Sequence, residues 1–210
     1  TTIGSDSHVV SIDLQTNNVY TLTATQYNNA NGKIVTNGIN ITGATAADVA
    51  ALATDTHIAA IAISDTAANL AANFDAIQAQ INAGRTISSI TVSDSQPIIL
   101  FPNSYAANTG ALSLVAEPYT IKMYGVLAYD LGTTTIGSDS HVVSIDLQTN
   151  NGYSLTATEY NNANGKIVTN GINIIGATAA DVAALATDTH ILAITVYDTA
   201  ANLAANFDAI

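Results

Sequence analysis

The chain of 210 residues is acidic and carries few cations. Sixteen Asp and Glu residues stand against four Lys and Arg residues, giving a formal net charge of −12. Such a surface has little with which to neutralise phosphates, which argues against nucleic acid and anionic membranes as partners. The hydrophobic fraction of 48% is enough to bury a core, and the absence of Cys excludes disulfides and thiolate metal sites.

A long internal repeat dominates the sequence. Residues 1–77 return as residues 134–210 with 69 identities in 77 positions. The chain therefore comprises a first full repeat period, residues 1–133, and a second, truncated period, residues 134–210. A weaker internal similarity divides the first period into sub-halves of about 1–85 and 86–133. Because the second copy stops inside a helical pattern, we expect the chain to be part of a longer repetitive polypeptide.

Five short segments share one pattern of β-branched and apolar residues. The pattern covers seven positions, which is too short for a helix and favours a strand. The segments are residues 8–14, 57–63, 86–92, 141–147 and 190–196. Their starts are far enough apart for crossover connections, so we expect neighbouring strands to be parallel.

Shorter elements are predicted between these strands. Alternation over residues 19–25 predicts a strand with a threonine-bearing face, and residues 27–32 predict a polar loop. Residues 33–35 and 39–42 follow as short strands, and residues 119–125 predict a further strand. A linker rich in Gly, Thr and Ser is expected at residues 131–140.

Two Ala-rich segments predict helices. The first spans residues 44–53, with Thr45 as its cap. The second spans residues 67–83, and Gly84 follows at the usual C-terminal position. Four apolar residues form one stripe along this second helix: Leu70, Phe74, Ile77 and Ile81. Together the elements predict an α/β solenoid, a tandem repeat of stacked parallel strands with the Ala-rich helices on one side.

Four of the five predicted strands begin at the His of a [Ser/Thr]-Asp-[Ser/Thr]-His sequence. Imidazoles and carboxylates brought together by stacking could bind a metal. The alternative is a turn in which Asp accepts backbone hydrogen bonds and His lies half exposed at the edge. The candidate metal ligands are Asp6, His8, Asp55, His57, Asp139, His141, Asp188 and His190.

Six Asp residues, two of them from these pairs, lie near predicted turns among Asn and Ser: Asp6, Asp13, Asp55, Asp65, Asp94 and Asp130. Oxygen-rich turns of this kind can hold Ca²⁺, and otherwise serve as caps and Asx turns. No catalytic residue is predicted, because the Ser, Asp and His of residues 5–8 are neighbours in sequence and such neighbours rarely form a triad. We therefore expect no enzymatic activity, and no cofactor other than Ca²⁺ is indicated.

The segment SDTAANLAANFDAI, residues 64–77, and residues 87–94 after it resemble repeats of very large secreted bacterial surface proteins. Those arrays often belong to type I secreted, adhesin-like polypeptides. The resemblance covers the whole period and implies an extracellular or cell-surface, calcium-rich setting without an active site. This chain has no Gly-Gly-x-Gly-x-Asp run, the calcium-binding pattern of that wider class.

The near-exact repeat without a distinct site predicts a mechanical role. We expect an extracellular structural repeat protein that forms a rod, sheath or filament by stacking, through self-association with further copies or repeats. The alternative is an adhesin or glycan-binding repeat module of a large surface protein, with glycans or a cell surface as partners. No apolar run approaches the ~20 residues that a membrane-spanning helix needs.

Overall fold

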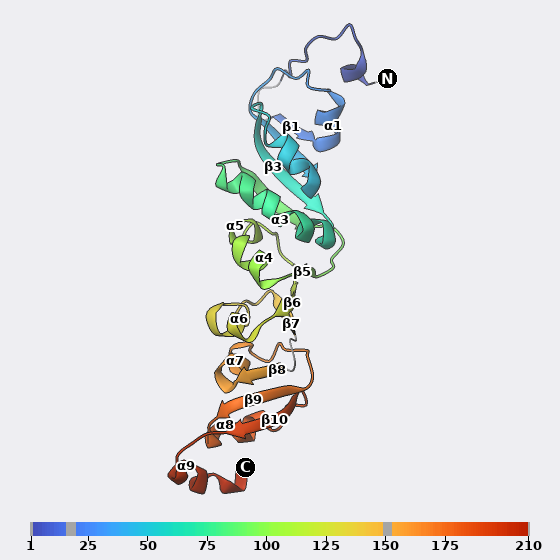
Figure 1. Cartoon of the computed structure of the whole chain (residues 1–210). Helices are drawn as coiled ribbons and strands as arrows, with labels where there is room; N and C mark the ends of the chain where they lie inside the picture. Colours follow the sequence, from blue (N-terminus) through green and yellow to red (C-terminus); the bar gives the residue numbers. More distant parts are fainter. Residues whose placement is uncertain (1, 16–19, 149–152, 210) are drawn as a thin grey trace. The chain divides into compact units, whose positions relative to one another are not determined.

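A computed structural model describes residues 2–15, 20–148 and 153–209. Helices alternate with strands along the chain, as predicted for an α/β protein (Figure 1). The strands form three small sheets, and the strand pairs described in them are parallel. Among the described residues, none of the helices has both the length and the apolar character required to cross a bilayer.

The chain divides into two compact units. One comprises Thr1–Ile98 and Asn103–Tyr119, and the other comprises Ile99–Pro102 and Thr120–Ile210. Each unit therefore contains one copy of the repeated segment. The division falls within the first period rather than at its end, residue 133.

A four-stranded parallel sheet organises the first unit, with strand order β1-β2-β3-β4. The strands are β1 (Tyr20–Thr23), β2 (Ile39–Ala44), β3 (Ile58–Asp65) and β4 (Ile87–Val92). The helical elements are η1 (Ile3–Ser5), α1 (Ala24–Asn29), η2 (Ala46–Asp48), α2 (Val49–Leu52), α3 (Ala67–Asn82), α4 (Pro102–Ala107) and α5 (Thr109–Leu112). Sequence neighbours in this sheet are also spatial neighbours, so each connection is a crossover through a helical element.

The predicted long helix is confirmed as α3. The Thr66 side chain accepts a hydrogen bond from the Asn69 amide at the N-terminus, and Gly84 follows the C-terminus with φ +80°. Three residues of the predicted stripe, Leu70, Phe74 and Ile77, are completely buried. The predicted helix at 44–53 is confirmed for residues 46–52, as η2 followed by α2.

The second unit contains two three-stranded sheets, β5-β6-β7 and β10-β9-β8. Their strands are β5 (Ile98–Leu100), β6 (Ile121–Val126), β7 (Val142–Leu147), β8 (Tyr153–Thr156), β9 (Ile172–Ala177) and β10 (Ile191–Val196). The helical elements are α6 (Ala128–Thr133), α7 (Ala157–Asn162), α8 (Ala179–Leu185), α9 (Ala200–Ala205) and η3 (Phe207–Ala209). Strands β8, β9 and β10 occupy the repeat positions of β1, β2 and β3.

The strand predicted at residues 8–14 is wrong. Among the described residues this segment makes only an isolated bridge, between Ile12 and Ile34. The equivalent segment in the second copy forms β7, which pairs with β6 and makes the equivalent bridge between Ile145 and Ile167. The same sequence thus becomes a strand where a neighbouring strand satisfies its second edge.

Two boundaries between predicted elements also differ. The strand predicted at 19–25 ends at Thr23, and Val19 lies outside the described residues. Thr23 forms a capping box with Gln26 and starts α1, so Thr25 and the first residues of the predicted loop are helical. Likewise, the predicted linker at 131–140 begins inside α6, where Leu131 is buried.

Candidate functional site

All four Asp-His pairs form the same turn. In each turn a carboxylate oxygen of the Asp accepts the backbone N–H of the His at 2.8–2.9 Å. The same oxygen lies 2.7–3.1 Å from the His Nδ1. The pairs are Asp6–His8, Asp55–His57, Asp139–His141 and Asp188–His190. This geometry agrees with the turn considered as the alternative to metal ligation.

A tyrosine completes two of the turns. The Tyr27 hydroxyl donates a hydrogen bond of 2.5 Å to Asp55, and the Tyr160 hydroxyl donates one to Asp188. Each carboxylate therefore receives the His on one oxygen and the Tyr on the other. Sequence reasoning missed these tyrosines, although the separation of 28 residues between Tyr and Asp recurs in both copies.

The tyrosine bonds alter the acidity of both partners. Burial opposes ionisation of Asp55, but the hydrogen bonds from Tyr27 and His57 outweigh it and lower the pKa of the carboxyl group. The pKa of Asp188 is lowered chiefly by the hydrogen bond from Tyr160. Burial, followed by the adjacent carboxylate, raises the pKa of both tyrosines. Each pair is thus held as a neutral phenol beside an ionised carboxylate.

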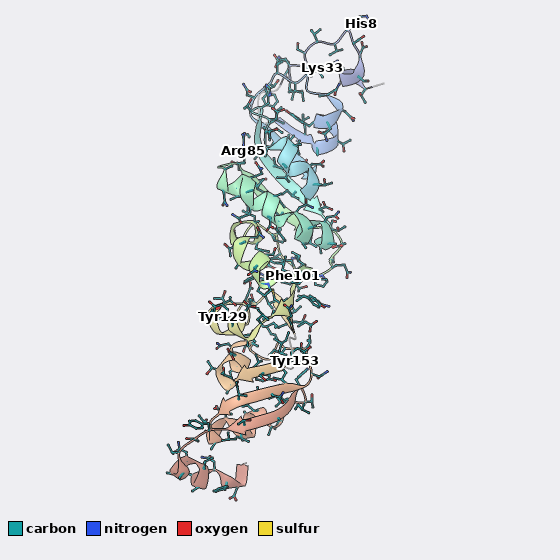
Figure 2. The ribbon with its side chains drawn as sticks, in the orientation of Figure 1. His8, Lys33, Arg85, Phe101, Tyr129 and Tyr153 are labelled. Carbon is teal, nitrogen blue, oxygen red and sulfur yellow. The ribbon has the colours of Figure 1, made fainter. Side chains whose placement is uncertain are left out.

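In each of the other two turns, a lysine side chain donates a hydrogen bond to the backbone carbonyl of the Asp. The Nζ of Lys33 donates to the Asp6 carbonyl oxygen at 2.7 Å, and the Nζ of Lys166 donates to that of Asp139 at 2.6 Å. Lys33 and His8 lie in the same part of the first unit (Figure 2). Three of the chain's four cations are lysines, and two of these three are used in this equivalent contact.

The eight candidate ligands are distributed over four separate turns. Within the described ranges, no three His, Cys, Asp or Glu side chains come together in a group that could hold a metal ion. A Ca²⁺ ion needs six to eight oxygen ligands, and each Asp here already accepts protein hydrogen bonds. Metal binding at these residues, Ca²⁺ included, stays a prediction.

A second set of Asp residues links the end of a strand to the start of the preceding helical segment. Asp65, at the end of β3, accepts the backbone N–H of Ala46, the first residue of the preceding helical segment, at 2.9 Å. Asp94 follows β4 and accepts the N–H of Ala67 at the start of α3 at 3.1 Å. In the second copy, Asp198 accepts the N–H of Ala179 at the start of α8 at 3.0 Å. Each carboxylate thereby satisfies an otherwise unpaired amide of the preceding helix.

A groove in the second unit has three aromatic side chains in its lining. The groove, of about 310 Å³, is lined by Phe101, Tyr124, Gly125, Asp146, Leu147, Gln148 and Tyr153. The rings of Phe101 and Tyr124 pack edge to face, with centroids 5.7 Å apart, and both side chains are more than half exposed. Figure 2 labels Phe101 and Tyr153. Exposed ring faces beside a carboxylate and an amide can take a ligand that combines apolar and hydroxyl surfaces.

Comparison of the chain with protein-family models, with curated proteins and with solved structures finds no match.

Proposed function

We propose that the protein is an extracellular structural repeat protein, an α/β solenoid whose layers stack into a rod, sheath or filament. The observation that supports this role most directly is that both repeat copies make the same contacts between successive layers. Tyr20 is opposite Ile39 in the first copy, and Tyr153 is opposite Ile172 in the second. The layer-linking carboxylates Asp65 and Asp198 also make equivalent bonds.

Stacking would give the polar side chains that both copies share the same structural role. The carboxylates and lysines bind backbone groups, and the tyrosines bind carboxylates, so the polar residues tie the layers and turns together. In a repeat protein, stability is approximately a sum over layers and their neighbour contacts. Such a chain can be extended by whole periods without a new core. The extracellular location rests on the resemblance at residues 64–77.

Electron microscopy of the native material tests the structural role. We expect rods or filaments of uniform width, formed by further repeats or by association of copies. Isolated compact particles with no elongated form would contradict the proposal.

The aromatic groove of the second unit favours a second candidate, glycan binding by a repeat module of an adhesin. Sugar rings present C–H faces that stack on aromatic side chains, and their hydroxyls can bond to Asp146 and Gln148. A glycan array probed with the whole chain tests this candidate. We expect binding to be lost in a Phe101→Ala/Tyr124→Ala variant and retained in Tyr129→Ala, which changes an exposed tyrosine outside the groove. A chain that binds no glycan would leave only the structural role.

A further inference from the structure

The aromatic groove of the second unit has a negative charge in its wall. Its lining, as far as the structure describes it, includes the carboxylate of Asp146 and no Lys or Arg residue. The chain as a whole has a formal net charge of −12. Local and overall charge therefore both favour a cationic ligand over an anionic one.

The two repeat copies use this carboxylate differently. In each copy one oxygen of the Asp accepts a Thr hydroxyl at 2.8 Å, from Thr36 to Asp13 and from Thr169 to Asp146. The second oxygen of Asp13 also accepts the side-chain amide of Gln15 at 3.3 Å. The second oxygen of Asp146 receives no hydrogen bond from the residues that the structure describes. Asp146 thus has an oxygen free to accept a bond from a ligand.

Gly125 shapes the wall of the groove beside strand β6. A Cβ at this position would lie 3.2 Å from Cδ1 of Phe101 and 3.6 Å from Oε1 of Gln148, and Gly125 has φ +70°. Pro102 restricts the backbone of Phe101 from the other side. The Phe101 ring is therefore held in place although the residue is more than half exposed. Gln148, the repeat equivalent of Gln15, lies here instead of bonding to its neighbouring Asp.

Three aromatic rings share the groove with the Asp146 carboxylate. They belong to Phe101, Tyr124 and Tyr153. The face of an aromatic ring attracts a cation through its quadrupole and also packs against apolar C–H groups. An ammonium group donates a charge-assisted hydrogen bond to a carboxylate, and this bond is stronger than that from a neutral hydroxyl. A sugar ring that carries a protonated amine satisfies the rings and the carboxylate together.

We propose that the groove binds a cationic amino sugar, a hexosamine whose amine is free and protonated. Its ammonium group bonds to Asp146, and the C–H face of its ring packs on Phe101 and Tyr124. This inference rests on the glycan-binding candidate of the proposed function and names the class of sugar. A neutral sugar offers the carboxylate only hydroxyl donors, and an acidic sugar brings a second negative charge beside it.

Lys122 is a cation on the same strand as Tyr124. Because the two residues are two positions apart in β6, their side chains lie on the same face of the strand. Lys122 is exposed and lies outside the groove lining, so water and salt screen its charge. An acidic sugar would need this lysine, whereas a cationic sugar would not.

Two oligosaccharides that differ only at nitrogen test the inference. One is a short chitosan oligomer, in which the amines are free, and the other is the chitin oligomer of the same length, in which they are acetylated. Isothermal titration into the whole chain is carried out at about pH 6, where a free amine of this kind is protonated. The free-amine oligomer should bind at least about tenfold more tightly. The Phe101→Ala/Tyr124→Ala variant should lose binding of both oligomers.

Variants of the chain locate the charge that is recognised. Asp146→Asn removes the charge but keeps an oxygen for the Thr169 hydroxyl, so it should weaken binding of the free-amine oligomer by about tenfold or more. Its effect on the acetylated oligomer should be less than about twofold. Asp13→Asn is the matched control, because it makes the same change in charge and in the Asp–Thr contact outside the groove lining. It should alter binding of either oligomer by less than about twofold.

Equal losses in Asp146→Asn and Asp13→Asn would overturn the inference, because the net charge of the chain would then attract the oligomer. Weaker binding in Lys122→Ala would also contradict it. If the acetylated oligomer binds as tightly as the free-amine oligomer, the class of sugar is wrong and the glycan-binding candidate stands. Binding of neither oligomer by a chain that binds other sugars on the glycan array would have the same meaning. An array without any binding would remove the glycan-binding candidate together with this inference.

Discussion

The turns at Asp55 and Asp188 each depend on a carboxylate with hydrogen-bond donors on both oxygens. Tyr160→Phe removes the phenolic donor from a partly buried, charged acceptor, so the free energy of unfolding should fall by about 1–2 kcal/mol. Urea denaturation of the whole chain measures this change. Tyr197→Phe is the matched control, because Tyr197 is 85% exposed and its side chain lies at the surface.

A loss for Tyr160→Phe no larger than that for Tyr197→Phe would show that the Tyr–Asp bond does not stabilise the turn.

The lowered carboxyl pKa values predict a loss of stability in acid. Asp55 and Asp188 have a lower pKa in the folded chain than in the unfolded one, so the unfolded state binds more protons as the pH falls. Their contribution is fully present above the unfolded value of about 4 and is lost as pH falls through the folded pKa. Thermal melting between pH 6 and pH 3 should show a falling Tm.

A chain with Asp55→Asn and Asp188→Asn should be less stable at pH 6 and should show a flatter dependence on pH. The same slope in the variant and the unaltered chain would assign the acid sensitivity to other groups.

Of the contacts in these turns, the sequence predicted the Asp-His pair but not its tyrosine partner. The Asp-His turn was predictable, since both partners lie within three residues and the pattern recurs four times. The tyrosine partners were not predicted, because 28 residues and a strand separate Tyr27 from Asp55 and only the fold brings them together. Their constant spacing in both copies was the available signal.

At the scale of elements, α3 and the segment equivalent to it in the second copy provide a matched comparison. Phe74 is completely buried, whereas its repeat equivalent Phe207 is 69% exposed. Phe74→Ala should therefore lower the free energy of unfolding by about 3–5 kcal/mol. Phe207→Ala makes the same chemical change and should cost less than about 0.5 kcal/mol, as surface substitutions do.

Chemical denaturation of the two single variants measures both losses. Equal losses would mean that the two helices bury their apolar faces to the same extent, contrary to the structure.

Asp65 and its repeat equivalent Asp198 provide a second matched pair, because each bonds from the end of a strand to the start of the preceding helical segment. Asp65 is buried and bonds to the amides of Ala46 and Thr66 and to the Asn69 side chain. Asp65→Ala leaves the buried Ala46 amide without this partner and removes two part-buried bonds, so the unfolding free energy should fall by about 2–3 kcal/mol.

Asp198→Ala removes the equivalent bonds at a more exposed site, where water can replace the carboxylate. Its cost should be smaller than that of Asp65→Ala. Urea denaturation compares the two, and a larger loss for Asp198→Ala would contradict the proposed dependence on burial.

Local sequence predicted elements well where one signal dominated. The stripe from Leu70 to Ile77, with Thr66 before it and Gly84 after it, was sufficient to predict α3. Prediction failed where two signals competed, as at Thr23, whose capping box ends the alternating strand pattern. It also failed at residues 8–14, because strand formation there depends on a neighbour that a local pattern cannot supply.

On the scale of the whole molecule, the sequence predicted parallel strands alternating with helices, and the sheets confirm this. The division into two compact units was not predicted, because it depends on which segments pack together rather than on the repeat period. The aromatic groove was also missed. Its residues come from segments spread between 101 and 153, two of them predicted as strands, and only the fold brings their side chains together.

Small-angle X-ray scattering of chains with one, two and three added 133-residue periods tests the central claim most directly, namely that the repeats stack as layers of one solenoid. The account predicts a constant cross-sectional radius and a maximum dimension that grows by the same increment with each period. A cross-section that increases with length, or the scattering of independent globules on flexible linkers, would contradict it.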